Sequence, residues 1–180
     1  SDGVNLRLSD VSGNSTTKEA RIGLRHYTEA EEDTALMYAQ SGNGTSAVYI
    51  GGGTGVMNAV ETIGFVTAAT DTTLSGTTRM LIDSSGKVGI GMTPTHNFNL
   101  RSAGTVEFRI QSTDDDARLQ ISSHNDESKD SILEFLSNTS TRGSILYDHN
   151  TTAASQKMDF KVGDNAVTAM TILGSGNVGI

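Results

Sequence analysis

The chain has 180 residues, a formal net charge of −8 and no cysteine. The acidic balance, without any basic run, argues against binding to nucleic acid phosphates, and the lack of cysteine excludes disulfides and thiolate chemistry. Leu, Ile, Val and Phe supply only 39 residues, few for a self-sufficient core, so we expect other copies of the chain to complete it. Neither a signal peptide nor a long apolar run is found, and we expect no membrane insertion.

Short segments in which apolar and polar residues alternate recur along the chain, a pattern typical of half-buried strands. Turn-forming stretches separate them, such as 41–46, 137–143 and 148–152. Only 28–40 has a plausible helical composition, and its counterpart later in the chain favours a polar loop followed by a strand. We therefore predict an all-β fold. The predicted strands are 4–8, 20–24, 35–38, 47–50, 63–65 and the hairpin 80–90, then 106–110, 117–121, 132–135, 144–147, 158–160 and the hairpin 170–180.

These segments form two copies of one unit. The phrase MLIDSSGKVGI (80–90) returns as MTILGSGNVGI (170–180), with seven of eleven positions identical. The earlier strands match at offsets of 102, 97, 97, 97 and 95 residues, so only loop lengths change. Such repetition indicates modular construction. We predict a first β-repeat over 1–91, a connector over 92–103 and a second β-repeat over 104–180.

The pairing within the repeated phrase follows from parity. Opposed residues of an antiparallel pair share a face, so a three-residue loop at 84–86 joins Met80 with Ile90 and Ile82 with Val88 on one face. A two-residue loop would separate these apolar side chains. Three-residue loops need a left-handed residue at the third position, which glycine adopts most easily. We therefore predict structural roles for Gly86 and for its partner Gly176.

Glycines also alternate with the apolar residues of the closing strand. Gly89, Gly91 and Gly179 leave the opposite face of the hairpins nearly bare. Because glycine weakens a strand, we expect compensation by the close approach of a backbone, which we assign to a neighbouring subunit. An ordinary exposed edge carrying small residues is the alternative.

No catalytic or cofactor motif is complete. GGGTG (51–55) has Val56 where the dinucleotide fingerprint has its third glycine, and a glycine-rich turn explains it. Asp114–Asp116 could hold a hard cation, but solvation of a hairpin tip accounts for them, and the calcium-like loop at 10–15 lacks its closing Glu. His26, His96, His124 and His149 do not have the spacing of metal ligands within one chain. The alternative of a metal bound on a threefold axis, with one His from each chain, stays open. We expect no enzyme activity, no cofactor and no metal site.

The repeated phrase, with its continuation GKVGIGMTP (86–94), resembles a motif of bacteriophage tail fibres, in which it punctuates the stalk ahead of an endosialidase-type intramolecular chaperone. Lys87 departs from the Asn of that motif, and the stretch after Pro94 is looser. The resemblance implies an elongated, intertwined homotrimeric virion protein, made in the host cytoplasm. Its implied partners are other tail fibre or tail proteins and a host cell-surface glycan or protein.

Three functions of different classes follow. The first is a structural stalk that supports host-receptor attachment, and the nearly constant loop lengths favour it. The second is a binding module whose inter-strand loops contact a host glycan or surface protein. The third is a fibre-borne polysaccharide depolymerase, which the scarcity of aromatic sugar platforms disfavours.

Overall fold

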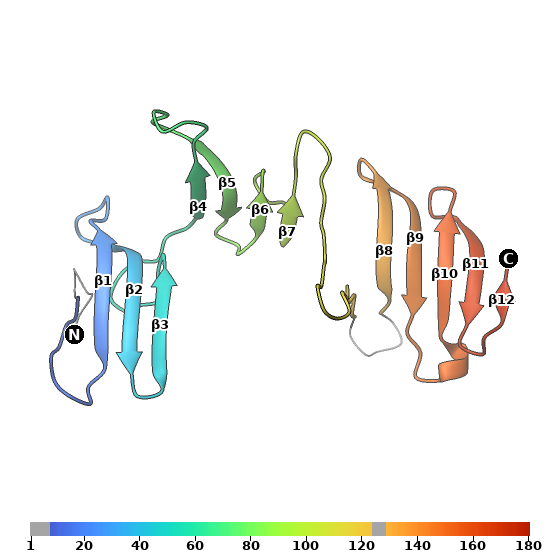
Figure 1. Cartoon of the computed structure of the whole chain (residues 1–180), viewed down its shortest axis with the longest axis horizontal. Coiled ribbons are helices and arrows are strands. Elements are labelled where there is room, and N and C mark those ends of the chain that lie inside the picture. Colours follow the sequence, from blue (N-terminus) through green and yellow to red (C-terminus); the bar gives the residue numbers. More distant parts are fainter. Residues whose placement is uncertain (1–7, 124–128) are drawn as a thin grey trace. The chain divides into compact units, whose positions relative to one another are not determined.

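The computed structural model describes residues 8–123 and 129–180, and it is all-β as predicted (Figure 1). Among these residues the only helical element is the three-residue 3₁₀ turn η1, Ala153–Ser155. No helix in the described part has the length and apolarity needed to cross a membrane. The chain divides into two compact units, Ser1–Glu107 and Phe108–Ile180.

The first unit begins with a three-stranded antiparallel sheet in the order β1-β2-β3. Its strands are β1 (Lys18–Leu24), β2 (Thr34–Gly42) and β3 (Thr45–Ile50). Within 28–40, residues 28–33 form a loop and 34–40 belong to β2, as the counterpart suggested, because Met37, Tyr38 and the residues after them pair with both β1 and β3. The turn expected over 41–46 is shorter, since Gly42 pairs with Thr45 and both strands extend into it.

A second sheet of the first unit has the order β4-β5-β6-β7. It contains β4 (Ile63–Thr67), β5 (Thr77–Ile82), β6 (Val88–Ile90) and β7 (Phe98–Leu100). The pairing of β5 with β6 is the predicted one, Met80 opposite Ile90 and Ile82 opposite Val88. β7 lies within the expected connector and runs parallel to β6.

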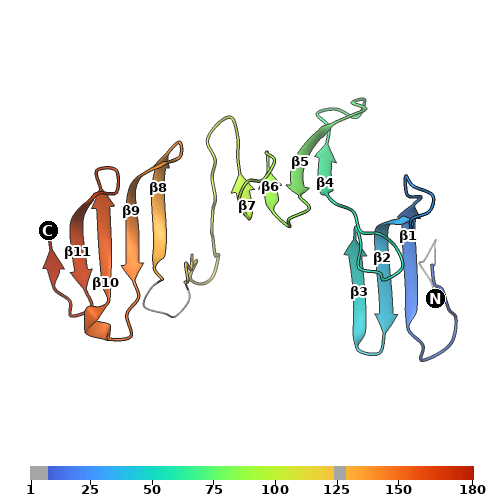
Figure 2. The ribbon, with the colours of Figure 1, turned by 180° about the vertical axis from the view of Figure 1, so that it is seen from behind.

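The second unit holds one five-stranded antiparallel sheet in the order β12-β11-β10-β9-β8. Every neighbour in this order is also the neighbour in sequence, so the sheet is a simple meander. Viewed from the front and from behind, no other element among the described residues of the unit lies on either face (Figures 1 and 2). Its strands are β8 (Ser131–Ser137), β9 (Ser140–Asp148), β10 (Lys157–Val162), β11 (Val167–Leu173) and β12 (Val178–Gly179).

Two predicted strands are wrong. Residues 106–110 and 117–121 alternate in polarity but form no strand, because within 8–123 and 129–180 no strand pairs with them through backbone hydrogen bonds. Their apolar side chains stay exposed, with Phe108 at 71% and Leu119 at 65%. The turn expected over 137–143 is reduced to the two residues between β8 and β9. Of the predicted strand 4–8, residues 4–7 lie outside the described residues.

Candidate functional site

The sheet β8–β12 has one face made almost entirely of apolar side chains. Partners across its ladders share a face, and the row Leu133, Ile145, Phe160, Met170 is one such set. The next row on that face joins Tyr147, Met158, Ile172 and Val178, and Phe135 adds a further aromatic ring. No charged residue belongs to it. We call this set the apolar face of sheet β8–β12: Leu133, Phe135, Ile145, Tyr147, Met158, Phe160, Met170, Ile172 and Val178.

The sheet β4–β7 repeats this arrangement. Ile63 pairs with Ile82, Ile82 with Val88 and Val88 with Phe98, and the next row is equally apolar. Five of these positions coincide with their repeat counterparts in the second unit, so the sequence repeat is a repeat of this face. Phe65 is 52% and Phe98 56% exposed. The apolar face of sheet β4–β7 comprises Ile63, Phe65, Met80, Ile82, Val88, Ile90, Phe98 and Leu100.

The sheet β1–β3 also has an apolar and a polar face. Its apolar residues, Ala20, Ile22, Met37, Ala39, Val48 and Ile50, are register partners and share one face. On the opposite face the Tyr38 hydroxyl donates a hydrogen bond to Glu19 Oε1 (2.8 Å), which raises the pKa of the tyrosine. The Tyr38 ring stacks on Tyr49 at 5.6 Å between centroids. Thr54 and Met57, in the loop after β3, contact this polar face at Arg21 and Gly23.

Among residues 8–123 and 129–180 no strand packs on these faces, and the main contacts between elements join strands that are neighbours in a sheet. Ala35, Tyr38 and Pro94 are the only residues with apolar side chains that are buried in this described part of the chain. Large contiguous apolar surfaces mark interaction sites, so these faces are the candidate functional surface.

The opposite face of sheet β4–β7 corrects the expectation for Gly89. A Cβ at Gly89 would lie 2.3 Å from the Met92 carbonyl oxygen and 2.9 Å from Pro94 Cδ. The backbone that approaches this glycine therefore belongs to the same chain, and not to a neighbouring subunit. Asn99 fixes the covering loop, because its Oδ1 accepts hydrogen bonds from the amides of Thr95 and His96, each at 2.8 Å.

The other predicted glycines fall into two groups. Gly86 and Gly176 have φ values of +76° and +87°, the left-handed conformation that their three-residue loops require. Gly91 also has a positive φ, and a Cβ there would meet the Arg101 carbonyl oxygen at 2.2 Å. Around Gly179, in contrast, the chain leaves open space for a Cβ.

The opposite face of sheet β8–β12 mixes apolar residues such as Ile132, Leu136 and Leu146 with polar ones, and it carries a buried carboxylate. Asp159 is only 4% exposed and accepts hydrogen bonds from Thr171 Oγ1 (2.7 Å) and Lys157 Nζ (3.0 Å). Burial alone would raise the pKa of Asp159, but these two hydrogen bonds and the lysine charge outweigh it and lower the pKa. The hydrogen bond to Asp159 in turn raises the pKa of Lys157. This network satisfies the buried carboxylate with groups of the same sheet.

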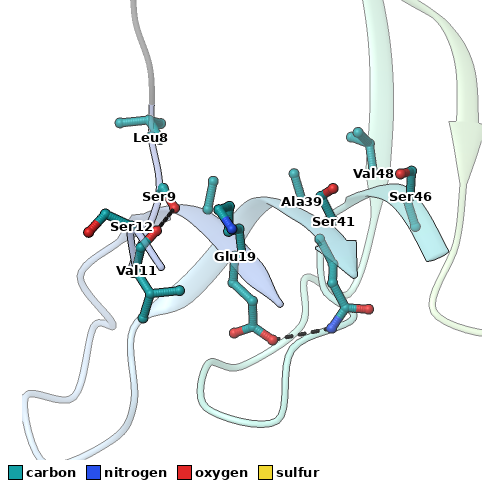
Figure 3. A pocket seen from close by; sticks show the side chains of 13 residues that line it. Leu8, Ser9, Val11, Ser12, Glu19, Ala39, Ser41, Ser46 and Val48 are labelled. Atoms are coloured by element: carbon teal, nitrogen blue, oxygen red, sulfur yellow. Dashed lines mark hydrogen bonds between the residues drawn. The ribbon is translucent and has the colours of Figure 1, made fainter. Parts of the chain in front are cut away.

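A groove of about 650 Å³ lies beside sheet β1–β3, between the sheet and the segment 8–12 (Figure 3). Leu8, Val11, Ala39 and Val48 give it apolar walls, and several serine hydroxyls line it. The Glu19 carboxylate, its most reactive group, already accepts hydrogen bonds from Tyr38 and Gln40 and pairs with Arg21. The groove can offer apolar contact and hydroxyl groups, but its carboxylate is committed to the sheet.

The remaining sequence motifs lie apart from one another. GGGTG (51–55) is an irregular connection, in which the Gly51 amide donates to the Leu36 carbonyl and the Gly51 carbonyl accepts from Val60. In the turn at Asp114–Asp116 the amides of Asp114 and Asp115 donate to Ser112 Oγ, and Asp116 pairs with Arg118.

The histidines are likewise separate. His149 contacts Ser131 and Tyr147, His26 and His96 hydrogen-bond to nearby threonines, and His124 lies outside the described residues. No group of three metal-ligating side chains occurs within 8–123 and 129–180.

Sequence reasoning missed two features of the surface. It treated 92–103 as a connector, although Phe98 and Leu100 alternate like the other strands and add to the apolar face. It also gave no role to Asp159, whose burial depends on the register of three strands. No protein-family model matches the sequence, and the comparison with curated proteins found no match either.

Proposed function

We propose that this chain is a structural segment of a trimeric bacteriophage tail fibre, a virion stalk that supports attachment to the host receptor. One observation carries the proposal. Three single-layer sheets each leave an apolar face open; on two of them the face is uncharged and the same positions recur. Such faces are stable in water only when something covers them, and identical copies supply a cover of matching chemistry.

The choice of three chains and of a fibre comes from the resemblance of 80–94 and 170–180 to the tail-fibre stalk motif. Its GxVGI strand is a structural part of each repeat, since Val88 and Ile90 belong to the apolar face of sheet β4–β7. Around a threefold axis, one apolar face per chain can meet two others and close a common core. The partners proposed for the assembly are neighbouring tail fibre or tail proteins and, at its tip, a host surface glycan or protein.

The test is the molar mass in solution. Light scattering coupled to size exclusion should give about three times the chain mass of 18.9 kDa at micromolar concentration. Small-angle scattering of the same peak should report an elongated particle. A stable monomer that neither self-associates nor binds a partner would overturn the proposal.

A binding role for the loops is the second candidate, and one loop favours it. The β4–β5 connection spans 68–76, whereas its counterpart between β10 and β11 spans only 163–166. Leu74, in the longer loop, is fully exposed. Stalk turns have no reason to differ in this way, but receptor-contacting loops do. Replacing 68–76 by 163–166 should abolish retention on host cells while leaving the molar mass unchanged if this loop binds the receptor.

A further inference from the structure

The tip of the β2–β3 hairpin carries the one Asn-Gly step of the sequence. Asn43 precedes Gly44 there, whereas each of the other asparagines precedes a residue that has a side chain. Gly42 pairs with Thr45, so Asn43 and Gly44 alone form the turn, and both are exposed. A peptide nitrogen that follows asparagine is least shielded when its own residue has no Cβ.

No hydrogen bond holds the carboxamide of Asn43 in the part of the chain that the structure describes. The carboxamides of several other asparagines are engaged in hydrogen bonds, namely those of Asn58, Asn99, Asn150 and Asn165. A Cβ added at Gly44 would have no atom within 4 Å, so nothing packs against the turn. The Asn43 side chain and the amide that follows it are therefore free to approach each other.

A second hairpin tip provides an internal comparison. Ser137 pairs with Ser140, so Asn138 and Thr139 form an exposed two-residue turn as well. Gly44 has a φ of +75°, and a glycine moves between left-handed and right-handed backbone at little cost. Thr139 is β-branched, which stiffens this residue and crowds its amide. The two turns thus differ in how easily the amide reaches the asparagine before it.

We propose that Asn43 is a site of spontaneous deamidation, a chemical modification that needs no enzyme and is independent of the proposed assembly. The Gly44 nitrogen, after losing its proton to water, bonds to Cγ of Asn43, and the carboxamide nitrogen leaves as ammonia. The product is a five-membered succinimide. Water then opens this ring at one of its two carbonyls: opening at Cγ gives aspartate, and opening at the main-chain carbonyl carbon gives isoaspartate. No oxidant or reductant is consumed, and each event adds one negative charge to the formal charge of −8.

Isoaspartate changes the backbone of the turn as well as its charge. The main chain then runs through Cβ and Cγ of residue 43, so the turn gains one backbone carbon. A two-residue turn fixes the register of the pairs next to it, here Ser41 opposite Ser46. Both serines line the groove beside sheet β1–β3. We expect the isoaspartate form to open this end of the hairpin and of the groove, whereas aspartate should leave the pairing unchanged.

Ageing of the purified chain at mildly alkaline pH tests the site. Peptide mapping by mass spectrometry should show a gain of about 1 Da at Asn43, as isoaspartate and aspartate, at least about tenfold faster than at Asn138. Gly44→Ala should slow the reaction at Asn43, and Thr139→Gly should accelerate it at Asn138. An unmodified Asn43, or equal rates at the two asparagines of the unaltered chain, would overturn the proposal. Thr139→Gly keeps the test decisive if Gly44→Ala does not fold, because an unchanged rate at Asn138 would contradict the role of the glycine.

Hydrogen exchange tests the effect on the hairpin. Asn43→Asp is the matched control, because it carries the same added charge without the extra backbone carbon. The amides of 40–47 should exchange at least about tenfold faster in the isoaspartate fraction than in the unmodified chain, and Asn43→Asp should change them little. Equal exchange in the isoaspartate fraction and in Asn43→Asp would overturn the opening of the hairpin.

Discussion

Opposite their apolar faces, the two repeats carry different residues at equivalent positions. Sheet β4–β7 has Gly64 paired with Leu81, where sheet β8–β12 has Asp159 paired with Thr171. The first sheet closes this side with the backbone at Met92–Pro94 over Gly89, and the second with hydrogen bonds to a buried carboxylate. The comparison teaches that the two repeats share the composition of one face, which we propose meets other chains, and differ in the residues of the opposite face.

The largest effect should come from a charge on the shared face. Phe160→Asp, and equally its counterpart Phe65→Asp, would place a carboxylate without a partner in the buried centre of an assembly. We expect either variant to abolish the trimer, as measured by light scattering. Thr168→Asp is the control, because Thr168 is exposed on the polar side of the same sheet. Intact trimers in both Phe variants would show that the apolar faces are not the contact surface.

The next prediction separates the two repeats. Gly89→Val would push a side chain into the Met92 carbonyl and Pro94, and should lower the local stability of β5–β6 by roughly 2–3 kcal/mol. Gly179→Val meets open space within the chain and gains β propensity, so it should be neutral unless another chain lies there. Native-state hydrogen exchange of each unit gives both values. Equal losses of stability in the two variants would mean that a partner chain lies against Gly179.

The two hairpin loops should respond alike. Gly86→Val and Gly176→Val force a β-branched residue into a left-handed conformation, at a cost of about 1–3 kcal/mol each. Neither glycine has atoms within 4 Å of an added Cβ, so the cost is backbone strain alone and the trimer should persist. Chemical denaturation followed by light scattering checks both parts.

The smallest expected effect is on the stability of sheet β8–β12 at low pH. Because the folded-state pKa of Asp159 lies below its ordinary value of 3.8, its stabilisation is full above that value and is lost as pH falls through the lower folded-state pKa. Asp159→Asn should cost about 1 kcal/mol at neutral pH and flatten the acid dependence of sheet β8–β12. Sheet β4–β7, with Gly64 at this position, should be unaffected. Hydrogen exchange of the two sheets at pH 3 and pH 6 measures the difference.

The features that were predicted correctly from the sequence are those that depend on local residue patterns. Alternation and parity were sufficient for the strands of the repeated phrase, for the pairing of Met80 with Ile90 and for the left-handed Gly86. They could not say which segment lies across a strand, so 117–121 was predicted as a strand that its own chain does not pair. For the same reason the neighbour of Gly89 was assigned to another subunit, although Met92 and Pro94 follow it closely in sequence. The burial of Asp159 needed the register of β9, β10 and β11, which no single strand encodes.

The meander order of sheet β8–β12 has a kinetic consequence. Every ladder joins strands that are adjacent in sequence, so each loop to be closed is short and the sheet can form rapidly. For the proposed assembly, the encounter of chains is then the slow step, and its rate depends on their concentration. Refolding from denaturant should therefore show a fast phase that is independent of concentration, followed by a phase that accelerates with it. Between the two phases the apolar faces remain exposed, and that interval is when misassembly competes with the native assembly.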